Sequence, residues 1–188
     1  MLNGMITWDS LRLAFLSVSM LTGLLSCSCE TSTQVSKETS LKLLQQLKAE
    51  LSFNEQDQLI AIDLSERDLA DADIPNLSPF DELREFHAIY TPLRGEFLTT
   101  LNQCRKLEVL NLYAAPIEDT HLNNLDGATS LKKVNLAGTN ISGASIPVIK
   151  SWQNLKELEL GDTSFTLEAI EKLHRELPEV EIYPVRSS

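Results

Sequence analysis

The chain has 188 residues, a length that suits one domain of ordinary size. Hydrophobic residues make up 43% of it and charged residues 23%, a composition that argues against a disordered chain. With 16 Lys and Arg against 27 Asp and Glu, the formal net charge is −11. That charge argues against nucleic acid as a partner and against electrostatic binding to an anionic membrane. Three cysteines are too few for a disulfide scaffold.

An uncharged apolar segment, Leu13–Leu25, lies close to the N-terminus. As a helix at ~1.5 Å per residue it would measure roughly 20 Å, which is too short to span a bilayer well and suits a signal-peptide hydrophobic region. The segment runs into the tetrapeptide LLSC, which ends at Cys27. This tetrapeptide resembles the lipobox of bacterial lipoproteins, and the resemblance implies that Cys27 carries lipid and that residues 1–26 are removed. Cys29 is a poorer candidate, because Ser26 would lie three positions before it.

Two segments separate this cysteine from the rest of the chain. Residues 27–38 are mostly small and polar, and we expect a flexible tether there. Residues 39–58 should hold a capping helix and a link. Thr39 or Ser40 can cap a helix that runs LKLLQQLKAEL over residues 41–51, with its leucines on one stripe. We expect this stripe to pack against the exposed N-terminal end of the domain that follows.

The remainder of the chain, residues 59–178, repeats every 24 residues without an insertion. The unit reads L-x-x-L-x-L-x-x-(T/A)-x-(L/I/F) and continues with apolar residues three apart. Every unit begins with leucine, at Leu59, Leu83, Leu107, Leu131 and Leu155. The first half alternates as a strand does, and the second half has helical spacing. Each unit is therefore predicted to be a short strand, a turn and a helical return, and it can bury its apolar face only against its neighbours.

This unit resembles the leucine-rich repeat family, in the 24-residue form found in bacteria. The resemblance implies an α/β solenoid with a curved parallel sheet on the concave side and helical returns on the convex side. Many members place Asn at the ninth position, where this chain has Arg67, Thr91, Ala115, Thr139 and Thr163. A threonine hydroxyl can satisfy the same backbone groups more weakly. Residues 179–188 should form a closing strand, around Val180–Tyr183, and a tail.

The sequence contains no catalytic constellation, and we expect neither an enzyme nor a bound cofactor or metal. Cys104 occupies a core-facing column, where cysteine behaves as a small hydrophobe. The three histidines, His87, His121 and His174, occupy different repeat positions and should not converge on a metal. The paired carboxylates Glu157 and Glu159 favour a solvated rim, because nothing in the sequence indicates a pocket around them.

Strand residues between the leucines should line the concave surface, which is where the family resemblance places a binding site. An apolar and aromatic centre with acids on both sides predicts a protein or peptide partner with apolar and basic residues. The candidate binding residues are Asp63, Glu66, His87, Ile89, Tyr90, Val109, Asn111, Tyr113, Asn135, Glu157 and Glu159. The alternative is that they are merely tolerated surface residues. A projected face of roughly 300 Å² is small beside the ~800 Å² per partner of a stable interface, so a peptide, a loop or a transient contact is favoured.

Taken together, these patterns predict a membrane-anchored, extracytoplasmic lipoprotein of a bacterial cell envelope that binds a protein or peptide through its concave sheet. Two alternatives remain open. The chain could be a structural envelope component with no ligand, or a cytoplasmic regulatory repeat domain. For the N-terminal segment, an uncleaved membrane anchor and a cytosolic chain with an apolar leader also stay open.

Overall fold

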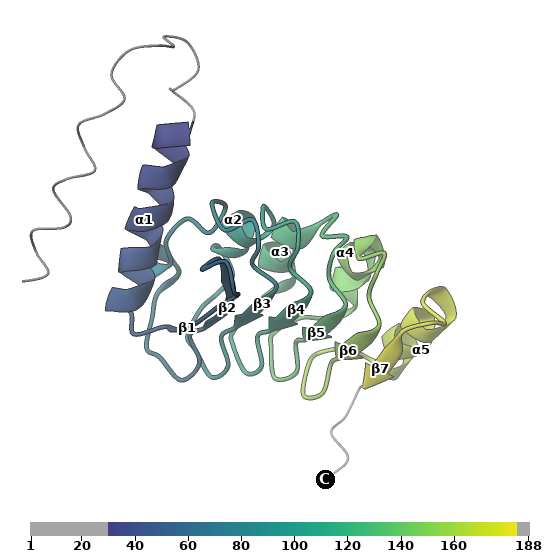
Figure 1. Ribbon diagram of the computed structural model, residues 1–188. Coiled ribbons are helices and arrows are strands. Elements are labelled where there is room, and N and C mark those ends of the chain that lie inside the picture. The colour runs from purple at the N-terminus through teal and green to yellow at the C-terminus, as the bar shows by residue number, and fades with distance from the viewer. Residues whose placement is uncertain (1–29, 184–188) are drawn as a thin grey trace, which may run out of the picture.

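The computed structural model describes the chain from Glu30 to Tyr183 (Figure 1). The strands are β1 (Glu50–Phe53), β2 (Leu59–Asp63), β3 (Glu85–His87), β4 (Val109–Asn111), β5 (Lys133–Asn135), β6 (Glu157–Glu159) and β7 (Glu181–Tyr183). The helical segments are α1 (Glu30–Gln46), η2 (Asp71–Asp73), α2 (Leu98–Leu101), α3 (Asp119–Leu122), η3 (Asn123–Leu125), η4 (Gly143–Ser145), α4 (Ile146–Ser151) and α5 (Leu167–Glu176). From β2 onward, each strand is followed by one or two helical segments before the next strand, as the repeat pattern predicted.

The strands form one sheet whose spatial order is the order of the chain, β1 to β7. Strands β2 to β7 are parallel, and each pairs with the next in the same register, so that Ala61 lies opposite Glu85 and Glu85 opposite Val109. Figure 1 shows the strands in a row, with α2, α3 and α4 behind them and α1 at the N-terminal end of the row. The predicted α/β solenoid is therefore confirmed.

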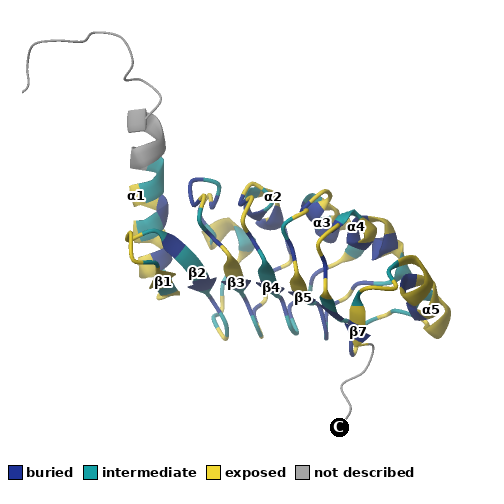
Figure 2. Ribbon diagram, turned by 45° about the vertical axis from the view of Figure 1, so that its right-hand side comes forward, coloured by how far each residue is buried: buried dark blue, intermediate teal, exposed yellow. Residues whose placement is uncertain are grey.

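The apolar columns of the repeat form the core. The first, fourth and sixth positions of all five units are buried, from Leu59, Ile62 and Leu64 onward. The later columns are buried as well, apart from four residues at the two ends of the array: Leu69, Ile74, Phe165 and Glu176. In Figure 2 buried residues recur along the whole row of strands and helical segments, so one core runs through the solenoid. Each fully buried leucine contributes about 1.5–3 kcal/mol relative to an exposed one.

In three of the five repeats, the turn that follows the strand uses the threonine at the ninth position as predicted. The hydroxyls of Thr91, Thr139 and Thr163 donate to the carbonyls of Ala88, Leu136 and Leu160 at 3.0, 2.6 and 2.7 Å. Each hydroxyl thereby satisfies a backbone acceptor within its own turn. Thr91 and Thr139 are buried, where an unpaired polar group would be costly.

The N-terminal cap differs from the sequence-based expectation in two ways. The helix ends at Gln46, and Leu51, expected in the helix, lies in β1, which pairs antiparallel with β2. Lys48 has φ 58, which ends the helix, and the chain then reverses along the open edge of β2. That edge offers hydrogen-bonding groups that helical periodicity does not reveal.

The second difference concerns the start of the same helix. α1 begins at Glu30, so most of the segment expected to be a flexible tether is helical. The hydroxyl of Ser40, expected to cap the helix, donates instead to the carbonyl of Asn76 at 2.8 Å. Leu44 is fully buried, and Leu41 and Leu47 pack against the core, so the helix covers the N-terminal end of the solenoid.

The C-terminal end of the array closes with β7, which matches the strand expected around residues 180–183. It pairs parallel with β6 in the register of the other strands, and Ile182 is buried. Within residues 30–183, no helix has the length and hydrophobicity needed to cross a membrane.

Candidate functional site

The open face of the sheet presents two rows of side chains. Residues that pair across neighbouring strands point to the same side, and the alternate residues, such as Ile62 and Leu110, are buried. One row consists of Ser52, Ala61, Glu85, Val109, Lys133, Glu157 and Glu181. The other consists of Glu50, Asp63, His87, Asn111, Asn135, Glu159 and Tyr183. Seven of the predicted binding residues lie in these rows.

The open face is strongly acidic. Its two rows hold six carboxylates against the single ammonium of Lys133, which gives a formal charge of −5 with His87 neutral. Lys133 Nζ lies 2.6 Å from Glu157 Oε1, so it offsets one of these carboxylates directly. At the C-terminal end, the Tyr183 hydroxyl donates to Glu181 Oε2 at 2.6 Å. That hydrogen bond, together with the negative charges of Glu181, Glu157 and Glu159, raises the pKa of Tyr183.

A cleft of about 150 Å³ opens on this face across β4, β5 and β6. It is lined by Val109, Leu110, Asn111, Lys133, Val134, Asn135, Glu157 and Glu159. Five of the predicted binding residues are among these, so residues that lie 24 apart in the sequence meet in one recess. The predicted site did not include Lys133, Glu181 and Tyr183. The 24-residue register of the repeat could have identified them, because it places all three in the two rows of the open face.

The predicted aromatic centre lies at the rim of the sheet, beside the cleft. Tyr90 and Tyr113 contact each other edge to face, with ring centroids 5.1 Å apart and planes at 82°. Tyr90 is 58% exposed, and Tyr113 and Ile89 are half-buried. All three follow the carboxyl ends of β3 and β4 instead of lying within them. The site is therefore a charged, cleft-bearing sheet with an aromatic pair at one edge.

Several predicted binding residues also hold the turn after their strand. Oδ1 of Asp63 accepts from the backbone N–H of Ser65 at 2.8 Å. Oδ1 of Asn111 and of Asn135 accept from the N–H groups two residues on, at 3.1 and 3.0 Å. These are Asx turns, in which a short polar side chain replaces a backbone acceptor. This hydrogen bond gives Asp63 a structural role. Unlike Asn111 and Asn135, Asp63 does not line the cleft. Glu66 lies in the same first turn and is exposed.

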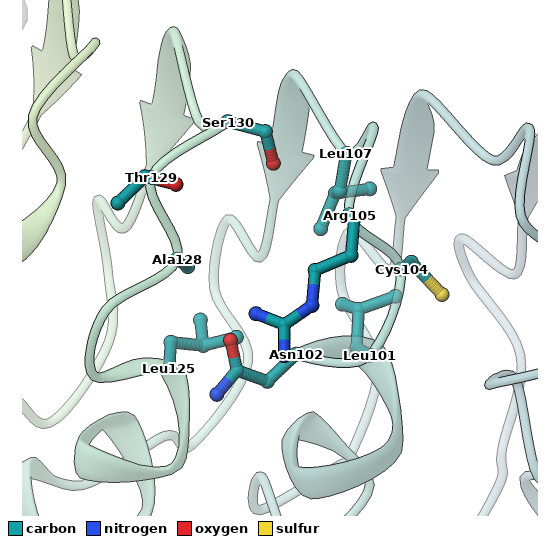
Figure 3. Close-up of a pocket in the computed structure, with 9 residues that line it drawn as sticks. All are labelled: Leu101, Asn102, Cys104, Arg105, Leu107, Leu125, Ala128, Thr129 and Ser130. Carbon is teal, nitrogen blue, oxygen red and sulfur yellow. The ribbon is translucent and has the colours of Figure 1, made fainter.

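Cys104 is a core residue, as predicted. It is 3% exposed, its Sγ donates to the carbonyl of Leu77 at 3.3 Å, and burial raises the pKa of the thiol to about 12. It borders a second cavity of about 20 Å³, which has room for about one water molecule. Figure 3 shows the sulfur turned away from the side chains across that cavity, such as Ala128 and Leu125. Neither the thiol nor the cavity forms a reactive site.

The histidines do not converge. His87 Nε2 lies 3.5 Å from Glu85 Oε2 on the open face, His174 is exposed on α5, and His121 is half-buried in α3. Nδ1 of His121 is buried without a hydrogen-bond partner. In the part of the chain that the structure describes, no group of three His, Cys, Asp or Glu side chains could hold a metal ion.

Comparison with known proteins gives a likeness in structure alone. No protein-family model matches the sequence, and no curated protein matches it. An internalin (inlF) from Listeria monocytogenes superposes with a TM-score of 0.52 at 18% identity, over 69% of this chain and 36% of that one. The leucine-rich repeat ectodomain of the membrane receptor kinase GASSHO1/SCHENGEN3 from Arabidopsis thaliana gives 0.51 at 15% identity, over 72% and 16%. The fold is a leucine-rich repeat solenoid. This leucine-rich repeat chain spans about a third of the internalin chain and about a sixth of the plant receptor chain.

Proposed function

We propose that this chain is a lipid-anchored, extracytoplasmic leucine-rich repeat protein of a bacterial envelope that binds a protein or peptide through its concave sheet. One observation carries the proposal: the pair formed by exposed Tyr90 and half-buried Tyr113 at the rim of a sheet that also bears a cleft of about 150 Å³. Aromatic side chains in such places are typical centres of protein interfaces. The plant receptor ectodomain was solved in complex with CASPARIAN STRIP INTEGRITY FACTOR 2, so the fold is compatible with this role.

The chief alternative is a structural envelope component whose sheet binds nothing. A spacer of this kind has no use for the part of the Tyr90 ring that stays in water, and Tyr90 is 58% exposed and lies outside the core. Burial of the exposed part of the ring against a partner would add hydrophobic stabilisation that a spacer does not use. The Tyr pair therefore supports binding over a purely structural role.

Photocrosslinking in intact cells tests the binding surface. Tyr90 is replaced by p-benzoylphenylalanine in cells that make the full chain, and a matched variant carries the same group at Lys172, which is exposed on α5. We expect an irradiated product of defined mass from position 90 and none from position 172. A product from position 172 alone would place the functional surface on the helices. No product from either position would favour the structural component.

The anchor is proposed from the LLSC tetrapeptide alone, because Cys27 lies outside the described residues. Stable anchoring takes at least two hydrophobic signals, and the lipoprotein modification supplies several acyl chains. Such an anchor would hold a chain of charge −11 at a surface that charge alone would make it avoid.

Metabolic labelling tests the anchor. Cells fed a radiolabelled fatty acid should label the wild-type chain and Cys29→Ser but not Cys27→Ser. Label that survives Cys27→Ser and disappears in Cys29→Ser would move the lipid to Cys29. If none of the three chains is labelled, the cytoplasmic regulatory domain becomes the better account.

A further inference from the structure

We propose that the cleft across β4, β5 and β6 receives one basic side chain, arginine or lysine, from the bound partner. This inference rests on the proposed function, because it names what the concave sheet recognises. The occupant is a segment of a partner protein in which a basic residue stands close to an apolar one.

The size of the cleft suits a single side chain. A cavity of about 150 Å³ holds a ligand about as large as benzene, which is close to the bulk of one long side chain. Val109 forms an apolar wall on β4, and Glu159 lies on β6 at the opposite end of the recess. An arginine or lysine fits this combination, because its methylene stem packs on apolar surface while its charged end reaches a carboxylate.

The charges of the cleft select a cation. Within it, Lys133 and Glu157 form an ion pair, which leaves Glu159 as the net negative charge. Among the described residues, Glu159 forms no ion pair with a Lys or Arg. The surrounding face adds further negative charge, because the neighbouring strand β7 carries Glu181 in the same row as Glu157. An anion would therefore be repelled and a cation attracted.

The carboxylate of Glu159 is already held in place. Its Oε2 accepts from Asn135 Nδ2 at 2.8 Å, and Asn135 is itself fixed by the bond from the N–H of Ala137 to its Oδ1. A carboxylate has about four acceptor sites, so this bond leaves room for a guanidinium or ammonium group. Because the group is ordered before binding, less conformational entropy is lost when the partner arrives.

The aromatic pair fixes where the apolar neighbour of the basic residue should lie. Tyr113 follows Asn111, the last residue of β4, by two residues in the turn after the strand, and two residues of chain span at most roughly 7 Å. A partner segment that fills the cleft and contacts Tyr113 should therefore carry its basic and apolar residues one or two positions apart.

Selection from a random dodecapeptide phage library on the full chain tests the inference. We expect the selected peptides to share an arginine or lysine one or two positions from an aliphatic or aromatic residue. A synthetic peptide of that sequence is then compared with a neutral isostere, citrulline for arginine or acetyl-lysine for lysine. The basic peptide should bind the wild-type chain about tenfold more tightly than the neutral one.

Three variants test whether the preference for the basic peptide arises from the carboxylates of the cleft. Glu159→Gln should reduce that tenfold preference to less than about twofold. Glu171→Gln, a matched loss of one exposed carboxylate on α5, should leave it unchanged. Lys133→Gln should tighten binding of the basic peptide severalfold, because it frees Glu157, and a gain of this kind does not arise from misfolding.

The outcomes separate this inference from the function beneath it. If no peptide is selected, both the concave binding function and the cationic cleft are wrong. If peptides are selected without a basic residue, or if the neutral isostere binds as tightly, the sheet binds peptides but the cleft is not a cation receptor. A tenfold preference that persists in Glu159→Gln also overturns the inference, since the basic residue then binds elsewhere.

Discussion

At the residue scale, the eighth position of every repeat has a left-handed backbone. Its φ is 60° at Glu66, 53° at Tyr90, 57° at Ala114, 71° at Gly138 and 56° at Asp162. Only glycine adopts this region without a steric penalty, which is about 1–2 kcal/mol for other residues. The turn after the strand imposes the conformation, and four of the five repeats accept the penalty. A column of Glu, Tyr, Ala, Gly and Asp does not reveal it in the sequence.

Ala114→Gly should stabilise the protein by about 0.5–1 kcal/mol. The relief of left-handed strain exceeds the entropy that glycine adds to the unfolded chain, about 0.4–1 kcal/mol. The neighbouring Ala115→Gly is the control, since Ala115 is buried and lies outside the left-handed region. It should destabilise by about 1–2 kcal/mol, through the lost methyl group and the added freedom of the backbone. Urea unfolding of both variants measures these changes. A loss of stability in both variants would contradict the prediction that the backbone of Ala114 is strained.

Cys104 should be nearly inert in the folded protein. Its pKa of about 12 lies about three units above the ordinary value of 9.0, so its thiolate is about a thousandfold scarcer at pH 8 than that of a free cysteine. Iodoacetamide at pH 8 should alkylate it only in denaturant, as peptide mass spectrometry can show. Because the folded state raises this pKa, the group favours folding below pH 9 and loses that contribution as the pH rises toward 12. Rapid alkylation of the native chain would show that the thiol is accessible.

At the element scale, Asp71 and Asp119 occupy the same position in two different repeats. Each accepts hydrogen bonds from residues near the start of the helical segment in the next repeat. The carboxylate of Asp71 accepts from the backbone N–H groups of Arg94, Gly95 and Glu96. Asp119, two repeats later, accepts from the N–H and hydroxyl of Ser142 at 2.9 and 2.7 Å and from the hydroxyl of Ser145. Each carboxylate thus satisfies donors that would otherwise be left unpaired near the start of a helix. The helical returns are held to one another as well as to the sheet.

Asp119→Ala should cost about 2–3 kcal/mol of stability. It removes charge-assisted hydrogen bonds and leaves the hydroxyl of Ser145, which is fully buried, without its acceptor. The control is Asp126→Ala, whose side chain is exposed and should tolerate the change within about 0.5 kcal/mol. Chemical denaturation followed by circular dichroism compares the two. Equal losses would mean that the carboxylate of Asp119 does not fasten the repeats.

At the scale of the whole molecule, stability comes from stacking. Each repeat buries its apolar columns only against its neighbours, so a defect in a central repeat weakens contacts on both sides. The ends are treated differently: α1 and β1 cover the first repeat, and the last repeat exposes Glu176 in a column that is otherwise apolar. One continuous core predicts a single cooperative transition for the described domain.

Leu131→Ala should lower the free energy of unfolding by about 2–5 kcal/mol, because Leu131 is fully buried in the fourth of five repeats. Lys156→Ala, at an exposed position of the following repeat, should change it by no more than about 0.5 kcal/mol. Denaturant titration monitored by the fluorescence of buried Trp152 reports both variants. Similar losses in the two would show that the repeat register is wrong.

The sequence by itself determined the register, the core and the strands of the solenoid. A buried column such as Leu59, Leu83 and Leu107 recurs because the side chains at the same position of successive repeats meet the same environment. Periodicity therefore reports burial directly. It also placed the two rows of the open face, since strand residues on either side of a buried one must point away from the core.

The tertiary structure alone decided the features that depend on contacts between distant segments. β1 exists because the edge of β2 offers it hydrogen bonds, although the leucines that lead into it continue a helical pattern. The cleft exists because side chains 24 residues apart leave a gap between Val109 and Glu159, a volume that no local pattern encodes. The aromatic pair forms because Tyr90, which has a left-handed backbone in the turn after β3, meets Tyr113 from the turn of the next repeat. Such features follow from shape and packing in three dimensions, whereas hydrophobic periodicity records only which face of each element is buried.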